Sequence, residues 1–227
     1  MEKVIAFSNR TEGRDKFLKF WQYFSKLMQA VIISRYSTQF GNLFSAVRDC
    51  RKFFRLGKSL LEIHYITQIL QDARLDSIQR ALAILGNASM AIRWIFDNLS
   101  FLSAAKVMLY DHKEVNRLAT TFWLLGLCFN LANSLREMMK SYAREATLKE
   151  ASIGKTTRWV VENLDELSLT RKKMILEITK IIGDMIVASN GAQIPYKVLG
   201  KQFSEKWVGI GGIVASMISI YQIWCTS

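Results

Sequence analysis

Basic side chains are the most concentrated chemical feature of this sequence, and they gather between residues 43 and 61. On a helix at about 100° per residue, five of them share one arc: Arg48, Arg51, Lys52, Arg55 and Lys58. The other side of that helix is apolar and includes Leu43, Val47, Phe54 and Leu61. This pattern is typical of a helix that lies in a membrane interface with its cations toward anionic headgroups. A water-soluble helix with a solvated basic face would show the same pattern.

Catalytic and metal-binding patterns find no support in the sequence. The run Gly154, Lys155, Thr156 resembles the end of a phosphate-binding loop, but Lys149 stands where that motif requires glycine, and no strand precedes it. His64 and His112 are far apart and have no paired cysteine or histidine nearby. We therefore expect a protein that is not an enzyme, with no metal and no cofactor.

Composition favours helices and a membrane. Half of the 227 residues are apolar, and one proline in the whole chain leaves long stretches free of helix breakers. The net charge is +12, and the first 80 residues hold 14 Lys and Arg against 7 Asp and Glu. A basic balance fits nucleic acid or an anionic membrane. Two long uncharged runs favour the membrane, and we expect no nucleic-acid partner.

Those two uncharged runs have the length of membrane helices. Residues 118–135 carry no charge over 18 positions, which is about 27 Å of helix and close to the hydrocarbon thickness. The buried helix of a soluble protein would look similar. Residues 207–227 are uncharged over 21 positions and contain small residues spaced about four apart, which allow close helix packing or oligomerisation: Gly211, Gly212, Ala215, Ser216 and Ser219.

A third apolar stretch, residues 81–110, contains an acid and a base four positions apart, Arg93 and Asp97. That spacing lets the two pair on one helix face. The stretch fits a membrane helix with an intramembrane ion pair or a pore-lining charge. A helical hairpin packed against the bundle from the cytosolic side fits it as well.

These segments predict an all-α integral membrane protein with amphipathic N-terminal helices and a C-terminal transmembrane helix. We divide the chain into an amphipathic membrane-remodelling region (1–80), membrane-embedded helices (81–135), a charged helical region (136–206) and the C-terminal helix (207–227). The charged region is expected to hold helices separated by a loop near residues 153–157. The sequence leaves open which side of the membrane it occupies.

The sequence resembles the peroxin-11 family of peroxisomal membrane proteins at four places that follow in the family's order. Residues 13–16, Lys19 and residues 22–23 resemble its N-terminal GRDK…K…QY motif. Residues 51–58 resemble its RKxxRxGK-type segment, and residues 93–99 its aromatic-Asp-x-Leu stretch. Residues 211–224 resemble its terminal glycine-rich helix that ends in Tyr and Trp.

The resemblance implies a protein of the peroxisomal membrane, or of the glycosomal membrane in a kinetoplastid, that elongates the membrane and promotes peroxisome division and proliferation. In that family an N-terminal amphipathic helix, here the one holding residues 51–58, inserts into the cytosolic leaflet and tubulates it. The implied partners are anionic lipid, further copies of the chain, a fission adaptor, a dynamin-related GTPase and a peroxin-19-type import receptor. The alternative function is a pore for small metabolites, lined by charges such as Arg93 and Asp97.

Overall fold

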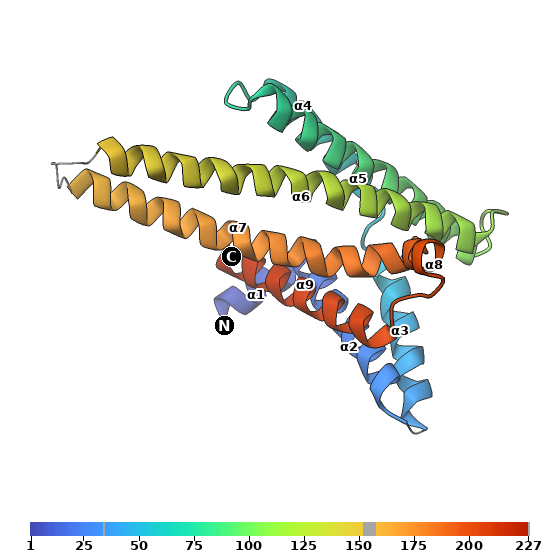
Figure 1. Ribbon diagram of the computed structural model, residues 1–227. Helices are drawn as coiled ribbons and strands as arrows, with labels where there is room; N and C mark the ends of the chain where they lie inside the picture. The colour runs from blue at the N-terminus through green and yellow to red at the C-terminus, as the bar shows by residue number, and fades with distance from the viewer. Residues whose placement is uncertain (34, 152–157, 227) are drawn as a thin grey trace.

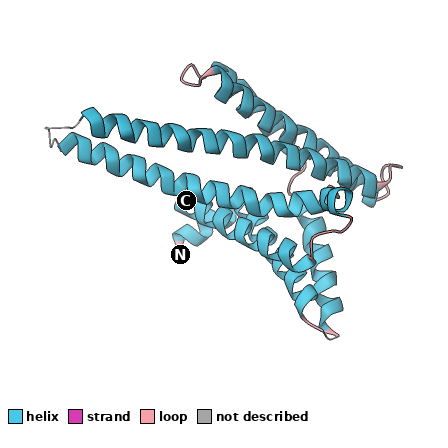
Figure 2. Cartoon of the chain, viewed as in Figure 1, coloured by secondary structure: helices cyan, strands magenta, loops and turns pink. Residues whose placement is uncertain are grey.

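The described part of the chain, residues 1–33, 35–151 and 158–226 of a computed structural model, consists of helices and their connections (Figures 1 and 2). Those residues contain no strand, which confirms the predicted all-α class. The helices are α1 (Glu2–Asn9), α2 (Thr11–Val31), α3 (Tyr36–Phe53), α4 (Lys58–Gln71), α5 (Ser77–Ala104), α6 (His112–Ala151), α7 (Arg158–Gly191), α8 (Ile194–Leu199) and α9 (Glu205–Cys225).

A long antiparallel hairpin of α6 and α7 lies at the centre of the fold (Figure 1). On one side α5 packs against α6, and α4 packs against α5. On the other side α9 packs against α7, α2 against α9, and α3 against α2. The apolar core lies where α2, α6, α7 and α9 meet, and includes Tyr23, Trp123, Leu127, Ile181 and Val208.

Helix α2 runs antiparallel to α9 along its whole length. Near one end Arg10 donates a hydrogen bond of 2.9 Å from Nη2 to the Thr226 carbonyl oxygen. Near the other end Lys26 forms an ion pair with Glu205. Helix α2 is therefore an integral part of the bundle and lies alongside α9, the C-terminal apolar helix.

The prediction of a single helix over residues 43–61 is wrong, because a turn separates α3 from α4. Helix α3 ends at Phe53, and Gly57 adopts a φ of +72°, a left-handed conformation that glycine reaches without a side-chain clash. Helix α4 then starts in a new direction at Lys58. Apolar spacing continued across the turn, so the periodicity did not reveal it.

Helices α6 and α9 are the two described helices that are long and apolar enough to cross a membrane. They contain the predicted spans 118–135 and 207–227, although α6 continues without a break beyond residue 135. The predicted loop near residues 153–157 lies outside the described residues. Asp76 starts α5 by accepting a 2.7 Å hydrogen bond from the backbone N–H of Gln79.

Burial is inverted relative to a water-soluble protein. Among the described residues more polar or charged side chains than apolar ones are buried, including Asp15, Lys19, Arg51, Arg55 and Arg93. Many large apolar side chains point outward instead. Charged side chains are almost never fully buried in soluble proteins unless they are paired, whereas in a membrane bundle they face the interior. The inversion therefore fits a bundle whose outer surface contacts lipid.

Candidate functional site

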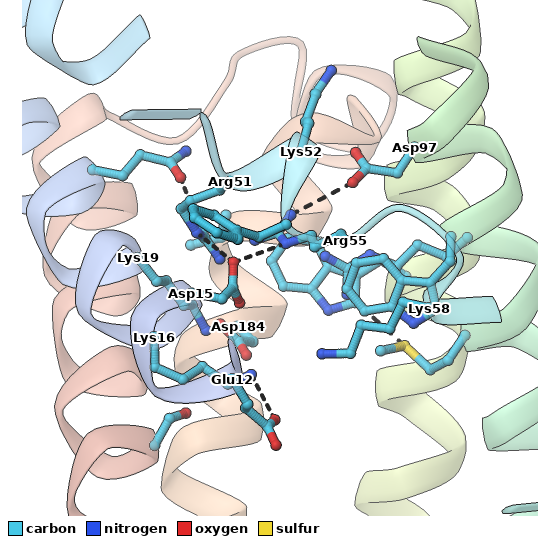
Figure 3. Close-up of a pocket in the computed structure, with 18 of the residues that line it drawn as sticks. Glu12, Asp15, Lys16, Lys19, Arg51, Lys52, Arg55, Lys58, Asp97 and Asp184 are labelled. Carbon is cyan, nitrogen blue, oxygen red and sulfur yellow. Dashed lines mark hydrogen bonds and ion pairs between the residues drawn. The ribbon is translucent and has the colours of Figure 1, made fainter. Parts of the chain in front are cut away.

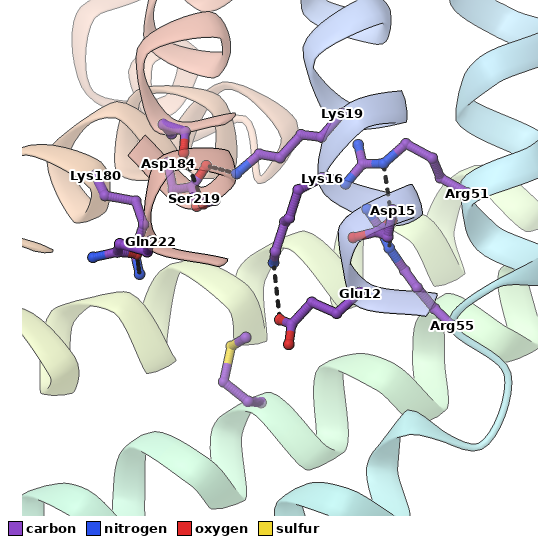
Figure 4. A network of polar contacts seen from close by, with 12 residues as sticks. Glu12, Asp15, Lys16, Lys19, Arg51, Arg55, Lys180, Asp184, Ser219 and Gln222 are labelled. Atoms are coloured by element: carbon purple, nitrogen blue, oxygen red, sulfur yellow. Dashed lines mark hydrogen bonds and ion pairs between the residues drawn. The ribbon is translucent and has the colours of Figure 1, made fainter. Parts of the chain in front are cut away.

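A network of buried charges centres on Asp15 of α2 (Figures 3 and 4). Its Oδ1 accepts a 3.0 Å hydrogen bond from Arg51 Nε and a 3.1 Å hydrogen bond from Arg55 Nε. Arg51 also donates to the side-chain oxygen of Gln22. All three charged side chains are at least 90% buried, so one carboxylate fixes the end of α3 and the following turn against α2.

The network extends to the central helices. Arg55 Nη1 lies 3.6 Å from Asp97 Oδ2 of α5. Lys52 Nζ donates to Ser100 Oγ at 3.0 Å and to Asn116 Oδ1 of α6 at 3.3 Å. The end of α3 and the turn after it therefore connect α2 with α5 and α6 through charged side chains.

A second buried ion pair joins α2 to α7. Lys19 Nζ lies 2.6 Å from Asp184 Oδ1, and both side chains are largely buried. Figure 4 shows this pair beside the Asp15 group, with Lys180 and Gln222 further along. Ion pairs therefore hold α2 against α7 and against the end of α3. A row of aromatic residues lies on the outward face of α2.

These positions correct the predicted orientation of the basic residues in 43–61. Arg51, Lys52 and Arg55 point inward and are buried, Lys58 is half-buried, and only Arg48 is exposed, beside Asp49. The apolar positions are also divided, since Leu43 and Leu61 are exposed, Val47 is buried and Phe54 is half-buried. Membrane contact by this segment remains a prediction, now with different residues facing outward.

Arg93 and Asp97 do not pair with each other, contrary to the spacing argument, because each has another neighbour. Asp97 faces Arg55. The Arg93 guanidinium carbon lies 4.2 Å from the centroid of the Trp94 ring and 4.0 Å from that of Trp123. Arg93 is 91% buried and lies between two aromatic rings, where cation–π attraction partly offsets its lost hydration.

The small residues of α9 pack against helices of the same chain. A Cβ added at Gly212 would lie 2.1 Å from Cγ of Tyr23, and Gly211 faces Gly183 of α7. Ala215, Ser216 and Ser219 are buried as well. Oligomerisation through these residues would require α9 to leave the bundle, so a contact between copies needs another surface.

Helix α4 presents the most exposed apolar surface in the N-terminal region. None of its residues is buried, and α5 is its only helical neighbour among the described elements. Its exposed apolar side chains are Leu60, Leu61, Ile63, Tyr65 and Leu70. The turn before it adds Leu56, and the end of α3 adds Phe53.

A cavity of about 1060 Å³ lies between the N-terminal helices and α5, α6, α7 and α9 (Figure 3). The charged network described above lines it, together with Arg93, Trp94 and Trp123. No group of three or more acidic, histidine or cysteine residues in the described part could hold a metal ion. The lining therefore suits polar or charged molecules.

Outside the cavity, acidic groups anchor the turn between α4 and α5. Hydrogen bonds from the Arg74 side chain and backbone lower the pKa of Asp72 to about 2. Hydrogen bonds from Lys140 and Arg136 of α6 lower the pKa of Asp76 below its ordinary value. Asp76 therefore ties this turn to α6, whereas Asp72 pairs with Arg74 within the turn.

The sequence did not reveal the acids on α2 and α7 that pair with the buried basic residues. Asp15, Lys19 and Gln22 recur at spacings of four and three, which places them on one face of α2. Spacing alone does not show whether such a face meets water or a buried partner. Asp184 gave no signal, because a single acid in the apolar half of a helix does not reveal its partner.

The whole chain is similar to one protein family. The family model described as Peroxisomal biogenesis factor 11 (PEX11) matches residues 1–224. The chain belongs to the PEX11 family. No solved structure matches this PEX11-family chain.

Relatives of this PEX11-family chain match over nearly their full length. The peroxisomal membrane protein 11 homolog of Dictyostelium discoideum is 23% identical over 99% of this chain and 94% of its own. Peroxisomal membrane protein PMP30B of Candida boidinii is 22% identical over 98% and 93%, and peroxisomal membrane protein 11A of Rattus norvegicus is 24% identical over 98% and 96%. This PEX11-family chain is an all-α protein of the peroxisomal membrane.

Proposed function

We propose that this PEX11-family protein elongates the peroxisomal membrane and thereby promotes peroxisome division and proliferation. The observation that carries the proposal is the outward apolar surface of the N-terminal region, of which α4 is the clearest part. Apolar side chains that enter one leaflet expand it and favour positive curvature. Helices α6 and α9 would hold this surface at the membrane and so raise its local concentration.

The revised orientation changes how lipid contact should be tested. Replacing Arg51, Lys52 and Arg55 by Glu would put acids into the buried network around Asp15 and Asp97. A loss of tubulation in that variant would report misfolding as readily as lost lipid contact. Variants at Leu60, Ile63 and Leu70 avoid this problem, because these residues share one face of α4, are exposed and do not line the charged cavity.

Replacing Leu60, Ile63 and Leu70 together by Ser is expected to abolish tubulation while the protein still reaches the membrane. Each large apolar side chain removed from water contributes about 1.5–3 kcal/mol, so most of the driving force for inserting this face is lost. Tubule length on vesicles reconstituted with the full chain, and peroxisome length in cells, would measure the effect.

The matched control replaces three exposed polar residues of the same helix, His64, Thr67 and Gln68, by Ser. We expect it to tubulate like the parent chain. Full tubulation by the Leu60, Ile63 and Leu70 variant would overturn the proposal.

The partners follow from the proposed function. Curvature alone does not cut a tubule, so we propose recruitment of a fission adaptor and a dynamin-related GTPase, and delivery by a peroxin-19-type receptor. Contacts between copies would concentrate the apolar surfaces, on a face other than the small residues of α9. The proposed role is mechanical and needs no catalytic group.

The charged cavity supports a second candidate function, a pore for small metabolites. Its lining includes Lys58, Arg93 and Asp97 inside a bundle with an apolar exterior. If ions pass through it, Arg93→Gln should shift the selectivity of single channels toward cations. Planar-bilayer recording on the purified chain tests this candidate: no conductance, or one unchanged by Arg93→Gln, would remove it.

A further inference from the structure

The charges that line the cavity do not balance. Ten basic side chains line it: Lys16, Lys19, Lys26, Arg48, Arg51, Lys52, Arg55, Lys58, Arg93 and Lys180. Six acidic side chains do so: Glu12, Asp15, Glu62, Asp97, Glu177 and Asp184. Lys26 and Arg48 pair with Glu205 and Asp49 outside the lining, which leaves eight basic side chains against six acidic ones.

All six carboxylates already have neighbours. Five form ion pairs, with Asp15 and Asp97 facing arginines and Glu12, Glu177 and Asp184 facing lysines. The sixth, Glu62, accepts a 2.9 Å hydrogen bond from the Trp94 indole N–H. Among the described lining residues, Glu62 is thus the one carboxylate without a cation within 4 Å, and a neutral N–H holds it in place.

Two cations beside Trp94 have no carboxylate within 4 Å in the described part of the chain. The Arg93 guanidinium carbon lies 4.2 Å, and Lys58 Nζ 5.1 Å, from the centroid of the same ring. The polar contact recorded for Arg93 is a weak one of 3.9 Å to the Met90 sulfur. An arginine that is 91% buried without a carboxylate partner keeps a positive charge that no neighbouring acid compensates.

Both side chains reach the cavity. Arg93 and Lys58 belong to its lining, and Figure 3 shows the Lys58 side chain extending into the space between α2 and α5. Lys58 follows Gly57 directly, so the left-handed turn that ends the α3 segment also places this ammonium group. The volume of about 1060 Å³ exceeds the needs of a single phosphate or carboxylate group.

We infer that this cavity binds an oxyanion, a phosphate or carboxylate group, held by Arg93 and Lys58 beside Trp94. The planar guanidinium suits two oxygens of such a group, and the ammonium adds a point charge. The group belongs either to a small soluble molecule or to the headgroup of an anionic lipid. The inference rests on the cavity and is independent of membrane elongation.

The test is the thermal unfolding midpoint of the purified full chain in neutral detergent. One arm titrates inorganic phosphate against sodium chloride of equal ionic strength, a second titrates acetate, and a third titrates phosphatidic acid against phosphatidylcholine. We expect a saturable rise in at least one of the phosphate, acetate and phosphatidic acid titrations, because a ligand that binds only the folded state stabilises it. A rise with phosphate or acetate identifies a soluble source, and a rise with phosphatidic acid alone identifies a headgroup.

Arg93→Gln is expected to weaken that binding about tenfold or more, the size of one charge-assisted hydrogen bond. Lys58→Gln provides the same test in a half-buried side chain for which no hydrogen bond is recorded, so this variant should fold even if Arg93→Gln does not. The control is Lys172→Gln on the exposed face of α7, away from the cavity, with unchanged binding expected.

The absence of a saturable rise in all three arms would overturn the inference, and so would parental affinity in Lys58→Gln. Its failure is distinguishable from failure of the proposed function. A chain that tubulates vesicles and binds no oxyanion refutes the cavity site alone, whereas oxyanion binding without tubulation refutes elongation alone.

Discussion

Asp15→Asn is expected to lower the free energy of unfolding by about 3–5 kcal/mol, the cost of removing one partner from a buried ion pair. Asparagine keeps the shape of the side chain but removes its charge. Arg51 and Arg55 would then remain buried beside a neutral amide, and only Arg55 would have another carboxylate, Asp97, within 4 Å. Helix α2 should therefore separate from α3 before the rest of the bundle unfolds.

Thermal unfolding in detergent and limited proteolysis would measure this effect, with earlier cleavage expected in the connection between α2 and α3. Asp49→Asn is the matched control, since Asp49 pairs with Arg48 on the surface at 3.0 Å and both side chains are about half exposed. Surface ion pairs contribute about 0–1 kcal/mol, so this variant should unfold close to the parent. Equal stability of the two variants would show that the buried network does not hold the N-terminal helices.

Gly212→Leu is expected to detach α2 from α9, at a cost near or above the upper end of the usual 1–3 kcal/mol for overpacking. Even a Cβ at this position would lie 2.1 Å from the Tyr23 ring, and that ring is 94% buried in the apolar core. A leucine side chain needs the volume that the ring now fills, so the ring must leave its place in the core or α2 must move away from α9, and either change weakens the contact between the two helices.

The separation should appear as easier proteolysis of the N-terminal region and a lower unfolding midpoint. Val214→Leu adds bulk to the exposed side of α9 and is expected to leave both readouts unchanged. A Gly212→Leu chain as stable as the Val214→Leu chain would contradict the close packing of α2 on α9.

The helices could be predicted from the sequence because few residues interrupt them. The uncharged runs 118–135 and 207–227 lie within α6 and α9. The break at Gly57 was not predictable from spacing, because glycine in an apolar position suits both a continuous helix and a turn. The turn lies next to contacts distant in sequence, those of Arg55 with Asp15 and Asp97, which spacing along the chain does not show.

The candidate site was harder to predict, because a helical wheel shows two faces without showing what each faces. The basic arc that includes Arg51 and Arg55 was assigned to the membrane surface, and in the structure it turns toward Asp15. In a bundle with an apolar exterior, buried charges and solvated charges have the same periodicity. Only the tertiary partner distinguishes them, and Asp184 is 165 positions from Lys19.

The central claim is that the outer face of α4 lies in lipid, and the accessibility of a spin label at Leu60 tests it most directly. The native Cys50, Cys128 and Cys225 are exposed, so they can be replaced before a label is attached at Leu60 or, as an aqueous control, at Arg74, whose side chain is 89% exposed. In reconstituted vesicles oxygen, which concentrates in the bilayer, should enhance the spin relaxation of the Leu60 label. A water-soluble nickel complex should enhance the spin relaxation of the Arg74 label. A Leu60 label that responds to nickel as strongly as the Arg74 label would contradict the account.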